Sequence, residues 1–133
     1  NLDLLQFHGE RDPAAVTWFP RRVIKAIRLE GDTDGMDLEP FAQAWGFLFD
    51  CAPAGLYGGT GRSWSYERIA HLEFRQPVLV AGGLNPDNVA QAAQASRADI
   101  VDVCSGVEAS PGVKDPRLLE RFIHEVRDVE SRD

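Results

Sequence analysis

The chain has 133 residues, with 14 Lys plus Arg against 21 Asp plus Glu, which gives a formal net charge of −7. This length fits one domain, and a composition with 44% hydrophobic and 26% charged residues excludes disordered, collagen-like and disulfide-framework classes. Net acidity disfavours nucleic acid and anionic membrane surfaces as partners, and no apolar run approaches the roughly 20 residues that cross a bilayer. We therefore expect a cytoplasmic protein that binds a small molecule, with no nucleic acid and no membrane as partner.

The first half of the chain predicts three strands, because three apolar runs each end at a glycine or a charged residue. These strands cover residues 4–9, 23–29 and 45–50. Between them we expect two short helices, one over 13–19 after the capping candidate Asp12 and one over 38–44.

The second half begins with a glycine-rich stretch over 53–61, which predicts a long loop. Because a helical crossover returns the chain to begin a neighbouring parallel strand, alternating strands and helices predict an α/β fold with a parallel sheet, in a single domain over 1–133. The remaining elements are a helix over 63–74, a strand over 77–83, a helix after Asn85 with Pro86 in its first turn, a strand over 100–104, and a last helix capped by Asp115 with Pro116 at its first position.

Polar residues interrupt four of the predicted strands. They are Gln6 (with His8 two positions on, on the same face), Lys25, Asp50 and Asp102. Burying such groups unpaired costs about 1–3 kcal/mol each, so we expect them to meet one another or a ligand. An internal salt-bridged layer that only fixes packing is the alternative for Gln6, Lys25 and Asp102.

Asp50 ends its strand and precedes the glycine-rich loop. In parallel α/β folds, ligands gather at the C-terminal ends of the strands, where a carboxyl group among apolar side chains can serve as a general acid. Phe47 and Phe49 are the candidates for those apolar neighbours. The alternative is that Asp50 only caps the turn by accepting hydrogen bonds from backbone N–H groups.

Two glycine turns follow consecutive strands, Gly82-Gly83 after one and Ser105-Gly106 after the next. Glycine lets the backbone approach a phosphate closely, and N–H groups at the start of a helical turn present partial positive charge to it. A pair of such turns predicts phosphate binding, although a glycine also commonly just ends a strand.

The cysteine and histidine positions predict no metal site and no disulfide framework. Cys51 and Cys104 lack CxxC or Cys/His spacing, and each is expected to act as a small apolar residue rather than a nucleophile. His71 and His124 lie on separate predicted helices and make poor metal ligands.

Several motifs, in this order and spacing, resemble the phosphoribosylanthranilate isomerase family of tryptophan biosynthesis. The resemblance covers nearly the whole chain, whereas a single motif such as GGL means little. The motifs are LQFHG at 5–9, IKAI at 24–27, LFD at 48–50, YGGTG at 57–61, AGGLNPDNV at 81–89, VDVCSGVE at 101–108 and PGVKD at 111–115.

The resemblance implies part of a (βα)8 TIM barrel. It also implies an isomerase that converts N-(5'-phosphoribosyl)anthranilate to 1-(2-carboxyphenylamino)-1-deoxyribulose 5-phosphate, an Amadori rearrangement of a phosphosugar without cofactor or metal. Asp50 matches the general acid of the family. The implied substrate- and phosphate-binding residues are Gly82, Gly83, Ser105, Gly106 and Asp102, together with Gly59 and Gly61 of the active-site loop.

The chain also departs from the family pattern. The general base of the family is a cysteine on the first strand, in a Cys-Gly-Ile-Thr motif, and an arginine after the second strand holds the substrate carboxylate; neither motif is present. The five predicted strands match the fourth to eighth of the barrel, and a complete barrel takes about 250 residues. We therefore expect the C-terminal part of a longer enzyme, with three N-terminal units absent.

Such a part is expected to expose two sheet edges and to have negligible activity alone, with a dimer or a complementing N-terminal segment as possible partners. Two other functions stay open at this stage. One is a non-catalytic phosphosugar-binding or assembly module, and the other is a related phosphate-binding barrel that acts on a different sugar phosphate.

Overall fold

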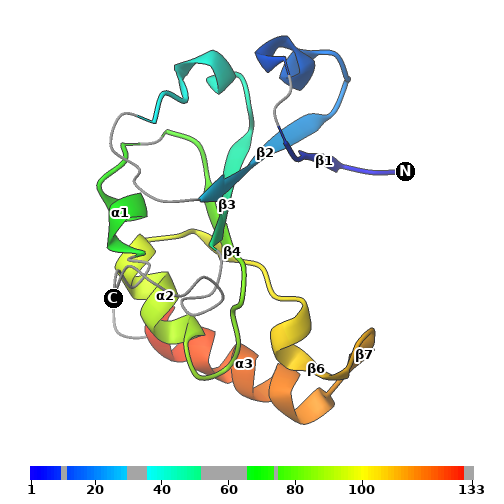
Figure 1. Cartoon of the computed structure of the whole chain (residues 1–133), viewed down its shortest axis with the longest axis vertical. Helices are drawn as coiled ribbons and strands as arrows, with labels where there is room; N and C mark the ends of the chain where they lie inside the picture. The colour runs from blue at the N-terminus through cyan, green and yellow to red at the C-terminus, as the bar shows by residue number, and fades with distance from the viewer. Residues whose placement is uncertain (10–11, 30–35, 52–65, 74, 131–133) are drawn as a thin grey trace, which may run out of the picture.

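A single curved sheet organises the chain, as the computed structural model shows for residues 1–9, 12–29, 36–51, 66–73 and 75–130 (Figure 1). Its five strands are all parallel and lie in chain order, so each strand pairs with the next one along the sequence. The predicted α/β class and parallel sheet are therefore confirmed. The strands are β1 (Leu4–Phe7), β2 (Arg22–Leu29), β3 (Gly46–Cys51), β4 (Val78–Ala81) and β5 (Ile100–Val101).

The two faces of the sheet carry different clusters of apolar side chains. Residues two apart share a face, so Leu48 packs with Ile24 and Leu79 on the concave side, while Phe47 and Phe49 belong to the larger cluster under the helices. The larger cluster is the main core, because it joins the sheet to α2 and α3 through Val89, Ala92 and Phe122.

Three α-helices lie along the convex side of the sheet (Figure 1). They are α1 (Glu67–Ala70), α2 (Val89–Ser96) and α3 (Pro116–Glu130). The start of α3 is as predicted, because the Asp115 carboxylate accepts from the backbone N–H of Arg117 at 2.8 Å and Pro116 needs no N–H partner.

The other predicted helices are shorter than expected. Only single 3₁₀ turns form at Pro13–Thr17, where Asp12 caps the first residues as predicted, and at Glu39–Phe41. Helix α2 begins at Val89 instead of directly after Asn85, because the side chain of Asn85 folds the preceding residues into a turn by accepting from Asp87 N–H at 2.8 Å.

A short antiparallel hairpin follows the fifth strand and was not predicted. It pairs β6 (Glu108–Ser110) with β7 (Val113–Lys114), and it lies at the opposite end of the arc from β1 (Figure 1). Its residues are mostly exposed, so no alternation of apolar and polar residues marks them as strands.

Lys25 does not join a polar layer on the concave side, which corrects the expectation that it meets other polar groups there. Its neighbours Ile24 and Ala26 face that side, so Lys25 points toward the convex side. Its ammonium donates to the carbonyls of Gly9 at 2.7 Å and Ala26 at 3.0 Å and lies 5.1 Å from the ring centre of Phe41. Burial lowers the pKa of Lys25.

Among the residues that the structure describes, β1 and β5 each pair with one strand only, so the sheet is open at both ends. Leu4 on β1 is 38% exposed and Ile100 on β5 is 41% exposed. Within the described parts of the chain, no helix has the length and apolar character needed to span a membrane.

Candidate functional site

A pocket of about 260 Å³ lies at the C-terminal ends of the strands, on the concave side of the sheet. Parallel α/β folds bind their ligands at these strand ends. The pocket gathers almost every residue that the sequence singled out. Its lining comprises Gln6, His8, Leu48, Asp50, Ala81, Gly82, Gly83, Leu84, Asp102, Cys104, Ser105 and Gly106.

Asp50 reaches the pocket because it alternates with Leu48, which faces the concave side. It pairs in register with Ala81, so the turn that follows β4 begins directly beside it. Gly82 makes this approach possible, since a Cβ at that position would collide with Asp50 Oδ1 and with the backbone of Cys51. The acid and the first glycine turn are therefore in contact.

The first turn has two consecutive glycines in the left-handed region, with φ of +89° at Gly82 and +67° at Gly83. Two asparagine side chains hold this conformation, because Asn88 Nδ2 donates to the Gly83 carbonyl at 3.1 Å and Asn85 Nδ2 does so at 3.5 Å. In a trans peptide the N–H points opposite to the C=O, so the N–H of Leu84 faces away from the asparagines.

The second turn, a 3₁₀ turn at Ser105–Val107, packs directly onto the first. A Cβ at Gly106 would lie 2.8 Å from the carbonyl carbon of Leu84 and 3.0 Å from Asn85 Cα, distances that real Cβ atoms avoid. Only glycine allows this approach, and it places both turns along one wall of the pocket.

The β6–β7 hairpin holds the start of the second turn in place through hydrogen bonds. Lys114 Nζ donates to the Cys104 carbonyl at 2.6 Å and to Glu108 Oε1 at 2.8 Å, while Gly112 N–H donates to Glu108 Oε2 at 3.2 Å. The hydrogen bond from Lys114 lowers the pKa of the Glu108 carboxyl and raises that of Lys114 itself. The hairpin thus fixes the backbone of Cys104, directly before Ser105.

Gln6 and His8 form the opposite wall of the pocket on β1 and just beyond it. Gln6 Nε2 lies 2.8 Å from His8 Nε2, an arrangement in which the amide donates and the ring nitrogen accepts. The prediction that these residues share a face is confirmed, because both line the pocket that contains Asp50 and Asp102.

The two cysteines occupy different environments. Cys51 is 1% exposed in the main core, where burial, and then the charge of Asp50, raise the pKa of its thiol to about 12. This agrees with the expected role of a small apolar residue. Cys104 instead lies beyond β5, directly before the second turn, where it is exposed and lines the pocket, so the same expectation was wrong for this residue.

Two expectations about the surroundings of Asp50 have different outcomes. Phe47 and Phe49 do not surround it, because they alternate onto the convex side of β3 and pack under the helices. Gly59 and Gly61 of the glycine-rich loop lie outside the described residues.

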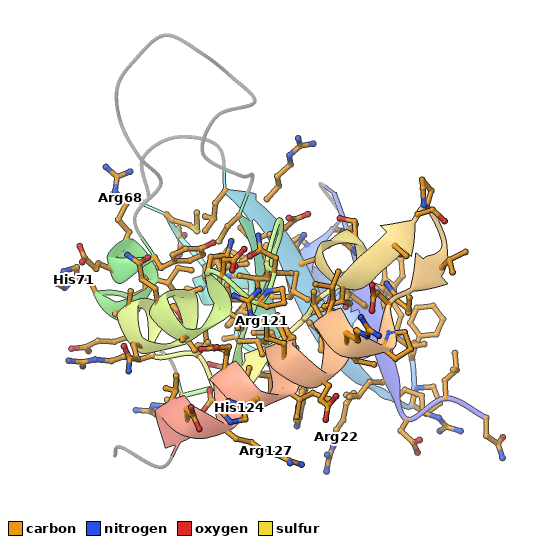
Figure 2. The ribbon with its side chains drawn as sticks, turned by 90° about the horizontal axis from the view of Figure 1, so that it is seen from below. Arg22, Arg68, His71, Arg121, His124 and Arg127 are labelled. Carbon is orange, nitrogen blue, oxygen red and sulfur yellow. The ribbon has the colours of Figure 1, made fainter. Side chains whose placement is uncertain are left out.

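No group of three or more His, Cys, Asp or Glu side chains among the described residues has a geometry that holds a metal ion. His71 directly follows α1 and His124 is on α3, and the two lie apart (Figure 2). A larger hollow of about 600 Å³, lined in part by Arg75 and Arg97, opens at the beginning of β4. It lies at the N-terminal ends of the strands, where this fold class does not place its ligand sites.

Comparison with known proteins gives one consistent family. Residues 1–125 match the family described as N-(5'-phosphoribosyl)anthranilate isomerase. A relative of that name from Acidithiobacillus ferrooxidans is 44% identical over 130 residues, which are 95% of this chain and 61% of the relative. The chain therefore spans about three fifths of the length of the relatives that it matches.

Solved structures of the same name show the same arrangement. The phosphoribosyl anthranilate isomerase of Thermotoga maritima superposes with a TM-score of 0.79 at 32% identity, over 96% of this chain and 62% of that one. A second structure, of a phosphoribosyl anthranilate isomerase in complex with reduced 1-(o-carboxyphenylamino)-1-deoxyribulose 5-phosphate, superposes with a TM-score of 0.77 at 28% identity, over 96% of this chain and 60% of that one. The sheet is thus the predicted partial TIM barrel.

Proposed function

This chain belongs to the N-(5'-phosphoribosyl)anthranilate isomerase family. We propose that it supplies the general acid and the phosphate-binding turns of that isomerase in tryptophan biosynthesis. The reaction is the rearrangement of N-(5'-phosphoribosyl)anthranilate to 1-(2-carboxyphenylamino)-1-deoxyribulose 5-phosphate. The observation that carries the proposal is the shared pocket, in which Asp50 contacts one glycine turn and the second turn completes the same wall.

Asp50 acts in this proposal as the general acid. Its carboxyl proton passes to the furanose ring oxygen, the bond from that oxygen to C1 breaks, and the nitrogen lone pair forms the C1–N double bond of a Schiff base. A base then removes the C2 proton to give the enol amine, which becomes the ketone when C1 is protonated. Asp50 is half-buried at the mouth of the pocket, which allows it to touch the ring.

The two glycine turns bind the 5'-phosphate. Gly82, Gly83, Ser105 and Gly106 expose backbone to the pocket without a side chain longer than a hydroxymethyl group, and backbone N–H groups bind phosphate well in such turns. Asp102 lies beside them on the same lining and accepts hydrogen bonds from sugar hydroxyls. This placement leaves the sugar between the turns and Asp50.

The base is proposed to come from barrel units that the relatives have and that lie outside this chain. Neither cysteine here replaces it, because Cys51 points into the core and Cys104 belongs to the second turn. We expect the chain alone to bind phosphate esters with negligible turnover. Adding the first three βα units as a separate polypeptide should restore isomerisation, measured by the change in anthranilate fluorescence as the N-glycosyl substrate is consumed; unaided turnover by this chain would contradict the proposal.

Asp50→Asn in the complemented enzyme tests the role of the acid. The amide keeps the size of the side chain but donates no carboxyl proton, so kcat should fall by about 100-fold or more while the affinity for a product analogue stays within a factor of about two. Glu39→Gln, on an exposed 3₁₀ turn, is the matched control and should change neither value. Unchanged kcat in Asp50→Asn would contradict the assignment of Asp50 as the general acid.

A further inference from the structure

We infer that Lys114, on β7, is a positioning residue for the phosphate site, because its ammonium directs the Ser105 N–H toward the pocket through the carbonyl of Cys104. This inference rests on the proposed function, since it assigns a residue outside the pocket to the phosphate-binding turns. The hydrogen bond on which it depends joins Lys114 Nζ to the Cys104 carbonyl oxygen at 2.6 Å. Cys104 and Ser105 are among the described residues that line the pocket, whereas Lys114 is not.

The peptide group between Cys104 and Ser105 explains how a residue outside the pocket can act on the ligand. In a trans peptide the C=O and the N–H point in opposite directions. Because the Cys104 carbonyl faces the ammonium in the hairpin, the Ser105 N–H lies on the other side of the same peptide, away from the hairpin. Among the described residues, no group accepts a hydrogen bond from this N–H, so it can donate to a phosphate oxygen.

The two ends of the second turn are held in different ways. At its end, Val107 is buried in the main core, and its carbonyl accepts from the backbone N–H of Asp115 at 2.9 Å. At its start, Cys104 and Ser105 are exposed, and Lys114 holds the backbone from the hairpin. Loss of the Lys114 side chain is therefore expected to loosen the start of the turn, where the phosphate donor lies, and to leave the end of the turn in place.

Glu108 fixes the position of the Lys114 ammonium. Its Oε1 accepts from Lys114 Nζ at 2.8 Å and its Oε2 accepts from the Gly112 N–H at 3.2 Å, so both carboxylate oxygens are held within the hairpin. The hydrogen bond to Glu108 raises the pKa of Lys114, which keeps the ammonium charged at neutral pH. Because the Lys114 side chain is 45% exposed and exposed ion pairs add little stability, we expect its loss to change ligand affinity more than the Tm.

The first turn presents its backbone in the same way, with a neutral donor in place of the cation. Asn88 Nδ2 donates to the Gly83 carbonyl at 3.1 Å, so the Leu84 N–H faces away from that side chain. A charged donor forms a stronger hydrogen bond than a neutral amide, and a hydrogen bond to a carbonyl oxygen polarises the N–H of the same peptide. We therefore expect the Ser105 N–H to be the stronger phosphate donor, and its strength to depend on the charge of Lys114.

The test uses the complemented enzyme, in which all 133 residues of this chain are combined with the first three βα units. Lys114→Met removes the donor, so the calorimetric affinity for inorganic phosphate should fall about 10-fold and KM should rise by about the same factor. Because the phosphate does not react, kcat should stay within about two-fold of wild type. Lys114→Arg keeps a charged donor and should bring phosphate affinity and KM to within about two-fold of wild type. Lys114→Gln keeps a neutral donor and should fall between Lys114→Arg and Lys114→Met.

Arg117→Met is the matched control, because it removes an exposed basic side chain at the start of α3, and it should leave phosphate affinity and KM unchanged. Wild-type phosphate affinity in Lys114→Met, or a loss of kcat that Lys114→Arg does not restore, overturns the role of Lys114 while the proposed function stands. If Lys114→Met does not fold, Lys114→Gln and Lys114→Arg are compared, and equal affinity in these two overturns the role. If the wild-type complex neither binds phosphate nor turns over substrate, the proposed function fails and the inference fails with it.

Discussion

Asp50 and Cys51 are consecutive residues on β3, and their side chains face opposite sides of the sheet. Asp50 points into the pocket, while Cys51 is sealed in the core behind it. Because thiolate is the reactive form, the raised pKa of the Cys51 thiol makes it inert, whereas Cys104 is exposed at the pocket. Alternation at one strand end thus separates a side chain that lines the pocket from one that packs in the core.

Thiol labelling should distinguish the two cysteines. At pH 8 an aromatic disulfide reagent is expected to modify one thiol per native chain, Cys104, and a second one only after unfolding in guanidinium chloride. Cys104→Ser should abolish the fast reaction, and Cys51→Ala should abolish the slow one. Two fast thiols in the native chain would contradict the burial of Cys51.

Alkaline pH should destabilise the fold through Cys51. The pKa of its thiol is raised from 9.0 to about 12 in the folded chain, first by burial and then by the charge of Asp50, so folding favours the protonated form. This contribution to the free energy of unfolding is complete below about pH 9 and is lost as the pH rises toward 12. Between pH 8 and 10 the Tm should fall more steeply for wild type than for Cys51→Ala; parallel slopes would contradict this assignment. Burial also raises the pKa of Tyr66 above its usual 10.0, but the contribution of Tyr66 to stability is lost only as the pH rises above about 10.

At the scale of elements, the two glycine turns form one interlocked unit. Gly106 packs against the backbone of Leu84 with no space for a methyl group, so Gly106→Ala should cost about 1–3 kcal/mol of stability and weaken phosphate binding, because it separates the turns. Urea unfolding and calorimetric titration of inorganic phosphate measure the two effects.

Gly112→Ala is the control for this prediction. Nothing lies within 4 Å of a Cβ at Gly112, but its φ of +80° disfavours alanine, so a loss of about 1 kcal/mol is expected from strain alone. Because Gly112 lies in the hairpin connection and not in the pocket, phosphate affinity should be unchanged. Equal phosphate affinity in both variants would show that the turns do not act together.

The elements show what sequence alone could predict. Apolar runs located all five strands, and capping chemistry located the start of α3. The β6–β7 hairpin was missed because its strands are exposed and are held by the Glu108 and Lys114 side chains. For the site, the expectation that Asp50 and Asp102 come together agrees with their place in one pocket lining. The contact of Gly106 with Leu84 could not be predicted, because it joins residues distant in sequence.

At the scale of the whole molecule, the unpaired edges of the sheet are expected to cause association in solution. The end strands β1 and β5 each leave one edge unpaired, and their concave-facing residues Leu4 and Ile100 are partly exposed. Unpaired edges with apolar side chains recruit other strands. The relatives are longer than the part that this chain matches, which is about three fifths of their length. The same edges are thus the docking positions proposed for the complementing units.

This geometry predicts self-association that complementation suppresses. Sedimentation velocity of the chain alone should show a weight-average mass that rises with concentration, and addition of the first three βα units should replace this with one complex of fixed stoichiometry. Ile100→Lys places a charge at the β5 edge and should reduce both kinds of association. Leu119→Lys, at a residue 38% exposed on α3, is the control, because a general gain in solubility would affect it equally. A chain that stays monomeric at high concentration, or equal effects of the two lysines, would show that the sheet edges are not the associating surface.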